Sequence, residues 1–294
     1  MGKSHADRRS MLSYRMRALY ISHKRIFVEP VIYFRGALAE EREKDAAAKY
    51  FRLIERRTLV KPGDLVIPRY SAMPYNKELQ EDVEEMGGKL INTYQQHCYV
   101  ADIRNWYYDL ADVTPRTWFS LDQIPQEGPF VLKGATNSKK HQWDTHMFAR
   151  NKREAGEVFC RLSQDSNVGV QPIYVREYVP LHRLADGLNG LPISEEYRFF
   201  VLDGEVVGAG FYWSSHIDDL DRTYDPFAEV PPGFIEHVVG RVSDKIRFWV
   251  FDVARRADGG WLVVELNDGQ QSGLSEVDPD VLYANMQKRL KPCA

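Results

Sequence analysis

The sequence predicts a protein of mixed α/β and α+β fold, and three observations support this prediction. Strand-like and helix-like segments alternate between about residues 26 and 103. Further on, two long apolar segments are folded back by the turn sequences Asp203-Gly204 and Asp258-Gly259-Gly260, which are typical of antiparallel hairpins. The chain has 294 residues, of which 44% are hydrophobic and 28% charged, so it is long enough for two or three globular units.

Overall charge and cysteine content exclude several classes of protein. A net charge of −3 gives no general argument for binding to nucleic acid or to a membrane surface. No run of 18 apolar residues is present, so no membrane-spanning helix is predicted. Cys98, Cys160 and Cys293 are scattered and lack metal-ligand spacing, which favours a reducing compartment over a disulfide framework. We therefore expect a cytoplasmic protein.

The first 25 residues form a basic arm, with seven Lys or Arg residues against the single acidic residue Asp7. No apolar segment follows the basic start, so a secretory signal is not predicted. An organellar transit peptide and a nucleic-acid-binding tail both fit this composition. A solvated extension, or a helix packed on its own domain, is the more common role of such an arm.

Residues 26–103 are predicted to form a small α/β unit. The predicted elements are a strand over 25–34, a helix over 37–57, a strand over 65–68, a helix over 76–86 and a strand over 89–92. The helix over 37–57 is rich in Ala and Glu and carries apolar residues at helical spacing. Pro30 has no amide hydrogen, which limits the first strand to a sheet edge or a bend.

The remaining two thirds of the chain are predicted to contain two hairpins, two further strands and four helices. The strands are expected over 128–133 and 170–180, the hairpins over 196–213 and 248–267, and the helices over 101–110, 148–162, 233–245 and 279–290. Each assignment depends on the apolar period, which is two in a strand and 3.6 in a helix.

The hairpin over 248–267 carries a candidate cation site. Asp252 lies near the end of its first strand, and Glu265 and Asn267 are two residues apart on the second, so their side chains share one face. Val264 and Leu266 are expected to point the other way. Carboxylate and amide oxygens suit a hard cation, and Mg²⁺ bound to phosphate oxygens is the expected occupant. The alternative is a solvated hairpin with polar residues facing water.

An Asp followed by Glu-x-Asn on the next strand resembles the metal-binding end of the ATP-grasp superfamily. That superfamily includes D-alanine–D-alanine ligase, glutathione synthetase and the ribosomal-protein glutamate ligases. The resemblance implies two α+β subdomains that clasp ATP, preceded by a small α/β domain, with Mg²⁺ or Mn²⁺ bound at Asp252, Glu265 and Asn267. The implied boundaries are 1–25 for the arm, 26–103 for the first domain, and 104–176 and 177–294 for the subdomains.

The phosphate-binding part of the resemblance lies on the strand over 128–133 and the loop after it. Lys133 ends the strand, and a loop containing Ser138, Lys139 and Lys140 follows. The pattern is not a P-loop, because no Gly-Lys-Ser/Thr opens a helix. It resembles the ATP-grasp strand lysine and mobile phosphate-covering loop, although Gly134 is the only glycine in that loop.

Before this strand, the helix over 101–110 resembles one that opens with a phosphate-contacting basic residue. Arg104 is the nearest basic residue, where many members of the superfamily use lysine, and Arg116 is a rival.

The strand over 170–180 resembles the adenine-binding hinge of the superfamily. Carried over to this sequence, Glu177 would accept a hydrogen bond from the adenine amino group. Tyr178 and Val179 would present backbone groups and an apolar wall to the base. Asp186, further along the chain, is the candidate contact to the ribose.

Two further parts of the resemblance concern the reacting groups. Glu196-Tyr197-Arg198 resembles the acidic-x-Arg element, which directs an arginine at the γ-phosphate or the acyl phosphate. The alternative is that Arg198 forms an ion pair with Glu195 or Glu196. The first domain helps to form the substrate pocket in this superfamily, so Arg69 and Ser71 become candidates for binding an anionic substrate. A surface salt bridge is the alternative role for Arg69.

The resemblance implies an ATP-dependent carboxylate–amine ligase, a carbon–nitrogen ligase that releases ADP through an acyl phosphate. Lys133 and Arg198 would be its catalytic residues, and small-molecule or peptide carboxylates and amines its substrates. An amino acid or peptide is the expected donor, and a homodimer is compatible with the resemblance. Two other functions stay open: a kinase or nucleotide-binding regulatory protein, and, ranked last, a nucleic-acid-associated ATP-binding protein that uses the basic arm.

Overall fold

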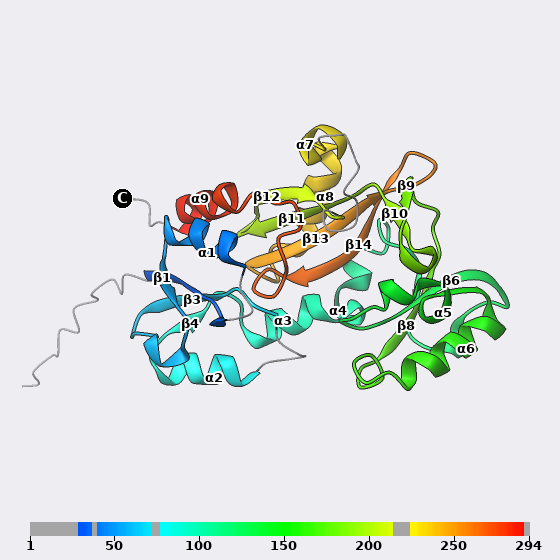
Figure 1. Ribbon diagram of the computed structural model, residues 1–294, viewed down its shortest axis with the longest axis horizontal. Helices are drawn as coiled ribbons and strands as arrows, with labels where there is room; N and C mark the ends of the chain where they lie inside the picture. Colours follow the sequence, from blue (N-terminus) through cyan, green and yellow to red (C-terminus); the bar gives the residue numbers. More distant parts are fainter. Residues whose placement is uncertain (1–28, 37–39, 72–76, 214–223, 291–294) are drawn as a thin grey trace, which may run out of the picture.

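The computed structural model of the protein describes residues 29–36, 40–71, 77–213 and 224–290, and Figure 1 shows how their elements are arranged. Three four-stranded sheets make up the fold, together with one two-stranded sheet and the helices that cover them. The predicted basic arm, residues 37–39 of the predicted first helix and part of the loop between 213 and 232 lie outside the described residues.

The first sheet is parallel, with the strand order β2-β1-β3-β4. Its strands are β1 (Glu29–Tyr33), β2 (Arg52–Ile54), β3 (Asp64–Pro68) and β4 (Lys89–Leu90), and the helix after β1 is α1 (Glu41–Ala48). The expectation that Pro30 confines β1 to an edge was wrong. Strand β1 is central, and β2 pairs only with 31–33, so Pro30 lies beyond the end of that ladder.

The predicted helix over 37–57 was too long. Helix α1 ends at Ala48 because the following apolar residues, Leu53 and Ile54 among them, pair with β1 instead. The pairing recruits them to the sheet although their spacing also fits a helix.

The second sheet is antiparallel, with the order β5-β8-β6-β7. Its strands are β5 (Thr117–Trp118), β6 (Glu127–Gly134), β7 (Phe148–Asn151) and β8 (Ile173–Glu177), and α6 (Lys152–Ser163) packs against it. The helix predicted over 148–162 therefore begins later than expected. Residues 148–151 form β7, and the Asn151 side chain caps the helix by accepting a hydrogen bond from the backbone N–H of Glu154 at 3.0 Å.

The third sheet contains the two predicted hairpins and has the order β12-β11-β13-β14. Its strands are β11 (Glu196–Leu202), β12 (Glu205–Phe211), β13 (Phe248–Arg255) and β14 (Trp261–Asp268). At the first turn, Asp203 and Gly204 have φ values of 47° and 82°, and two consecutive positive values are what a type I′ hairpin turn requires. Helices α8 (Pro232–Val242) and α9 (Pro279–Leu290) follow β12 and β14.

Short elements complete the fold. They are α2 (Lys77–Glu85), α3 (Tyr94–Ala101), α4 (Ile103–Trp106), α5 (Trp143–His146) and α7 (Pro226–Glu229), with β9 (Arg183–Asp186) and β10 (Pro192–Ser194) as a two-stranded sheet. Within the described part of the chain, none of the helices has the length and apolar character needed to span a bilayer.

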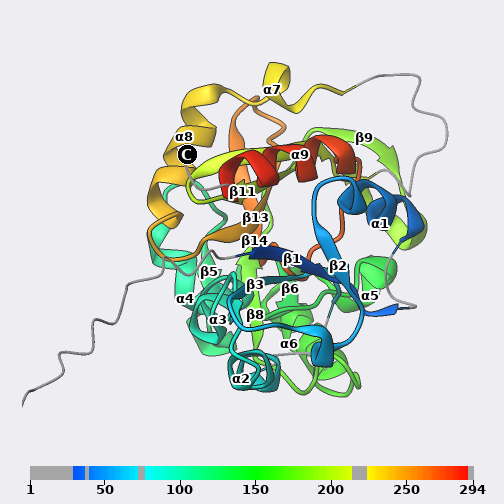
Figure 2. The ribbon, with the colours of Figure 1, turned by 90° about the vertical axis from the view of Figure 1, so that its left-hand side faces the viewer.

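The two faces of the third sheet belong to different hydrophobic cores. Phe199 and Phe251 point into one core together with α8. Phe200 and Val250 point into the other, which the first sheet and α9 complete; Figure 2 shows α9 and α1 over one end of this sheet. Because side chains alternate along a strand, Arg198 shares the face of Phe200. The site therefore occupies one end of an otherwise apolar face.

A β-bulge interrupts the ladder between β13 and β14. Asp252 pairs with Glu265, but Val253 pairs with Val263, so Val264 is an extra residue with no partner on β13. Bulges re-aim side chains and are common beside active sites. Val264 and Glu265 consequently both line the same cavity, and the expectation that Val264 turns away from Glu265 was wrong.

Candidate active site

The main cavity has a volume of about 180 Å³ and lies between the second and third sheets. Six residues predicted to bind the nucleotide or metal, or to act on phosphate, line it: Lys133, Ser138, Glu177, Tyr178, Val179 and Glu265. Apolar side chains from β6 and β14, including Val131 and Val264, form its walls. The cavity thus has an apolar body with polar groups concentrated at the Lys133 end.

A second cavity, of about 210 Å³, lies beside the main one. Its lining includes Ser71, Thr136, Arg198, Asn267 and Glu265, and it has almost no apolar side chains. Glu265 lines both cavities. The structure therefore brings the predicted substrate contact Ser71 to the same space as Arg198 and two of the predicted metal ligands.

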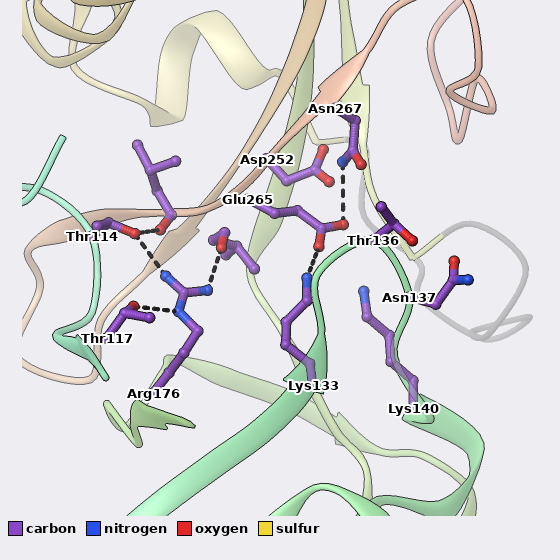
Figure 3. A network of polar contacts seen from close by, with 12 residues as sticks. Thr114, Thr117, Lys133, Thr136, Asn137, Lys140, Arg176, Asp252, Glu265 and Asn267 are labelled. Carbon is purple, nitrogen blue, oxygen red and sulfur yellow. Dashed lines mark hydrogen bonds and ion pairs between the residues drawn. The ribbon is translucent and has the colours of Figure 1, made fainter. Parts of the chain in front are cut away.

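A row of charged side chains crosses the site from one sheet to another, and Figure 3 shows its centre. Two nitrogen atoms of Arg198 donate to Asp252, with Nε–Oδ1 and Nη2–Oδ2 distances of 2.8 Å. Across the next ladder, Glu265 lies opposite Asp252 and accepts a hydrogen bond from Lys133 at 2.5 Å. Asn267 donates to Glu265 at 3.3 Å. Arg198 therefore pairs with neither Glu195 nor Glu196, the two partners considered from the sequence.

Burial and neighbouring charge set the protonation of these groups. Burial works against ionisation of Glu265, but Lys133, Lys140 and Arg198 outweigh it and hold the pKa of this carboxyl well below its usual range. Burial by itself raises the pKa of Asp252, and Arg198 lowers it again. In turn Asp252 raises the pKa of Arg198 against the effect of burial. The two hydrogen bonds thus hold Arg198 and Asp252 as an ion pair.

Of the two adjacent lysines in the loop after β6, only the second points into the main cavity. Lys139, the predicted phosphate contact, forms an ion pair with Asp165 at 2.5 Å. Lys140 lines the cavity, donates to the Tyr212 hydroxyl at 2.7 Å and lies 4.3 Å from the centre of its ring. Neighbouring residues point in different directions, and the sequence carried no signal to decide between them.

Arg176 is a second residue that the sequence analysis missed. It lies on β8, lines the main cavity and donates to the Val264 carbonyl at 2.5 Å and to the Thr114 hydroxyl at 2.7 Å. The bulge exposes that carbonyl, so Arg176 joins the second sheet to the third (Figure 3). Burial lowers the pKa of Arg176 to about 10, a value at which the guanidinium is still charged at neutral pH.

Arg69, Arg104 and Asp186 line neither of the two cavities. Arg69 was expected to bind substrate or to form a surface salt bridge, and both expectations were wrong. Its buried side chain donates to Glu43 at 2.8 Å and to the Gly269 carbonyl, so it fastens the first domain to the end of β14.

The other two residues lie on outer surfaces of the fold. The Arg104 guanidinium lies over the rings of Phe119 and Tyr174, each at 5.3 Å from the ring centre. Asp186 is exposed and pairs with Arg183. Neither position supports the predicted phosphate or ribose contact in this conformation.

Glu196 is a buried carboxyl in the main cavity with an unusual protonation. Its Oε1 atom has no hydrogen-bond partner among the described residues. Burial raises its pKa from the ordinary 4.5 to about 7, with Lys140 opposing the shift and Asp252 adding to it. At neutral pH this carboxyl is therefore close to half protonated.

We expect Glu196 to make the stability of the protein depend on pH. Its folded pKa lies above the unfolded one, so its contribution is complete below pH 4.5 and is lost as the pH rises through 7. Glu196→Gln should remove this loss and be more stable than the native chain at pH 8 by about 3 kcal/mol, since one pKa unit corresponds to about 1.4 kcal/mol. Urea unfolding at pH 5 and pH 8 measures it. A native-to-variant difference that is the same at both pH values would contradict the assignment.

The residues predicted to hold a divalent cation have suitable chemistry. Asp252, Glu265 and Asn267 offer two carboxylates and an amide on one face, and hard cations prefer such oxygen donors. Among the described residues there is no cluster of three or more His, Cys, Asp or Glu side chains that could hold a metal. A cation here would thus depend on the amide of Asn267 and on oxygen atoms of a ligand.

The fold and this arrangement of cations and carboxylates define an ATP-grasp protein. Residues 120–286 match the model of an ATP-grasp domain family, family 3 of its clade, and the chain belongs to this family. The predicted superfamily and fold are thereby confirmed. No curated protein sequence matches the chain.

Solved structures with the same fold extend over nearly the whole chain. The ATP-grasp ligase PsnB, in complex with a phosphomimetic variant of a minimal precursor, Mg and ADP, has a TM-score of 0.54 at 13% identity, with 90% of this chain and 98% of that chain covered. D-cycloserine synthetase DcsG gives 0.56, 14%, 89% and 100%. A RimK domain ATP-grasp protein from Sphaerobacter thermophilus gives 0.52, 14%, 87% and 98%. At these identities the likeness concerns the fold.

Proposed function

We propose that the protein is an ATP-dependent carboxylate–amine ligase that releases ADP and phosphate. The observation that carries this proposal is the junction of the two cavities at Glu265, with Lys133 on one side and Arg198 on the other. The main cavity suits a nucleotide, because Glu177, Tyr178 and Val179 line it as a hinge would. The polar second cavity suits the groups that react with the γ-phosphate.

In the first step, a substrate carboxylate oxygen attacks the γ-phosphorus of ATP and the bond to the β-phosphate oxygen breaks, giving an acyl phosphate and ADP. Lys133 and Lys140 would bind phosphate oxygens in the main cavity, and Arg198 would stabilise the charge of the transferring group from the second cavity. These cations are already held by fixed partners, so little reorganisation is needed when charge develops.

In the second step, an amine nitrogen attacks the acyl carbon, the C–O bond to phosphate breaks, and the nitrogen loses a proton to give the amide. No side-chain nucleophile is required. Water must be kept from the acyl phosphate, and we propose that the loop over 134–146, anchored by the Lys139–Asp165 ion pair, closes over it.

Asp252, Glu265 and Asn267 would hold the divalent cation that ATP-grasp proteins use, Mg²⁺ or Mn²⁺. When bound, such a cation neutralises charge on the β- and γ-phosphates. Glu265 is well prepared for this role, because its lowered pKa keeps it ionised at any physiological pH.

We propose an amino acid or a peptide as the substrate, with Ser71 among its contacts and the residues 26–103 as the domain that helps to bind it. The volume of the second cavity, about 210 Å³, suits an amino-acid-sized group. PsnB, which shares the fold, was solved with a peptide precursor. The main alternative is a kinase, since the same cations would serve phosphoryl transfer to another acceptor.

The proposal is tested by measuring ADP release with Mg²⁺ and ATP against pools of amino acids, with hydroxylamine present to trap an acyl phosphate. Native protein, Glu265→Ala and a matched control, Glu157→Ala, are compared. Glu157 is an exposed carboxylate that pairs with Arg153 on α6, away from the site.

Hydroxamate and ADP that depend on one pool, persist in the control and vanish in Glu265→Ala are expected. ADP without hydroxamate would favour the kinase. Absence of ATP binding to the native protein would overturn the assignment of the main cavity.

A further inference from the structure

Tyr212 follows directly after β12 and lies between two cations of the site. Its hydroxyl accepts a hydrogen bond from Lys140 at 2.7 Å. The guanidinium of Arg198 lies over its ring, 4.9 Å from the centre. Lys140 lines the main cavity and Arg198 lines the second one. A single aromatic side chain therefore contacts one cation from each cavity.

Lys140 depends on aromatic groups for its position. Its ammonium group is 4.3 Å from the centre of the Tyr212 ring and 5.1 Å from that of Trp213. The ammonium group donates its hydrogen bond to Tyr212 and not to a carboxylate, although Glu196 and Glu265 are near enough to raise the pKa of this lysine. Cation–π contacts and the hydroxyl thus hold the ammonium group while it stays unpaired with either carboxylate.

Tyr212 is suited to remain a neutral anchor. Burial raises the pKa of its phenol, and Lys140 opposes that shift without reversing it. The hydroxyl therefore stays protonated at neutral pH and offers an oxygen lone pair to Lys140. A carboxylate at this position would neutralise the lysine, whereas a phenol positions it and leaves its charge available.

We propose that Tyr212 is a positioning residue, which acts through Lys140 and holds the ammonium group where nucleotide phosphate binds. The proposal rests on the proposed nucleotide site in the main cavity. Without the hydroxyl, Lys140 is free to pair with Glu196 or Glu265, and a phosphate must then break that ion pair. Nucleotide binding is weakened although every group that contacts the phosphate is still present.

The expected effects follow from the chemistry of these contacts. Tyr212→Phe keeps the ring under Arg198 and removes only the hydroxyl, so we expect the Kd for an ATP analogue to rise about tenfold, the usual effect of losing a hydrogen bond to a charged group. Lys140→Met should raise it about a hundredfold by removing the phosphate contact. In the double variant, Tyr212→Phe should add almost nothing to Lys140→Met, because there is no lysine left to position.

Calorimetric titration with Mg²⁺ and a non-hydrolysable ATP analogue measures these constants, and it requires no knowledge of the other substrates. Two matched controls are available. Tyr283→Phe removes a buried hydroxyl, bonded to Glu43, that lines neither cavity. Lys139→Met removes the adjacent lysine, which pairs with Asp165. Thermal unfolding of every variant confirms that the fold is intact.

Non-additive effects of Tyr212→Phe and Lys140→Met, with additive effects of Tyr212→Phe and Lys139→Met, are the expected result. Additive effects of Tyr212→Phe and Lys140→Met, or an unchanged Kd in Tyr212→Phe, would overturn the positioning role and leave the proposed function intact. A native chain that binds no nucleotide would overturn both.

Discussion

Arg198→Met is expected to lower the free energy of unfolding by about 3–5 kcal/mol and to abolish ATP-dependent turnover. The substitution leaves the carboxylate of Asp252, which is fully buried, without the two hydrogen bonds that hold it as an ion, and an uncompensated buried charge costs about this much. Turnover is lost for a separate reason, because the cation between the two cavities is gone. Urea unfolding and ADP release measure the two effects.

A double variant separates stability from function at this pair. Arg198→Met combined with Asp252→Leu removes both charges from the same buried position, so most of the lost stability should return, since apolar residues can replace a buried ion pair at little cost. Turnover should not return. A double variant as unstable as Arg198→Met alone would show that the Arg198 contact to the Gly273 carbonyl, and not the ion pair, is what stabilises the fold.

Lys133→Met is expected to reduce the rate of phosphoryl transfer by about 10²–10³, the usual effect of removing one preorganised electrostatic group. The expected loss of stability is smaller than for Arg198→Met, because Lys140 and Arg198 still compensate Glu265. Single-turnover measurements with saturating ATP isolate the chemical step. Lys139→Met is the matched control and should leave that rate unchanged; a rate in Lys133→Met within threefold of the native one would remove Lys133 from the mechanism.

Local sequence patterns predicted the elements of the fold well where one rule dominated. Asp203-Gly204 placed a hairpin turn, and helix α9 spans the predicted region 279–290. The ordered series Lys133, Glu177, Arg198, Asp252 and Glu265 predicted which strands meet, and four of these five side chains line the two cavities. Asp252 does not, since it is buried behind Arg198.

What the sequence did not predict are features that depend on contacts between distant segments. Arg69 resembles an exposed loop residue in the sequence, but Glu43 and the Gly269 carbonyl, from two other parts of the chain, enclose it. The choice of Lys140 over Lys139 depends on Tyr212, more than seventy residues away along the chain. Helix α1 ends early because β1 recruits the residues after it. No local period contains such information.

The bulge at Val264 determines where this chain tolerates changes in length. Extra residues in the turn over 256–260 would extend the hairpin into solvent and leave the pairing of Asp252 with Glu265 untouched. Deleting one residue next to Val264 would instead restore a regular ladder and take away the carbonyl that Arg176 binds. It would also end the arrangement in which consecutive side chains line one cavity. Insertions in relatives are therefore expected at the tip of this hairpin, whereas the spacing around 263–265 should be kept.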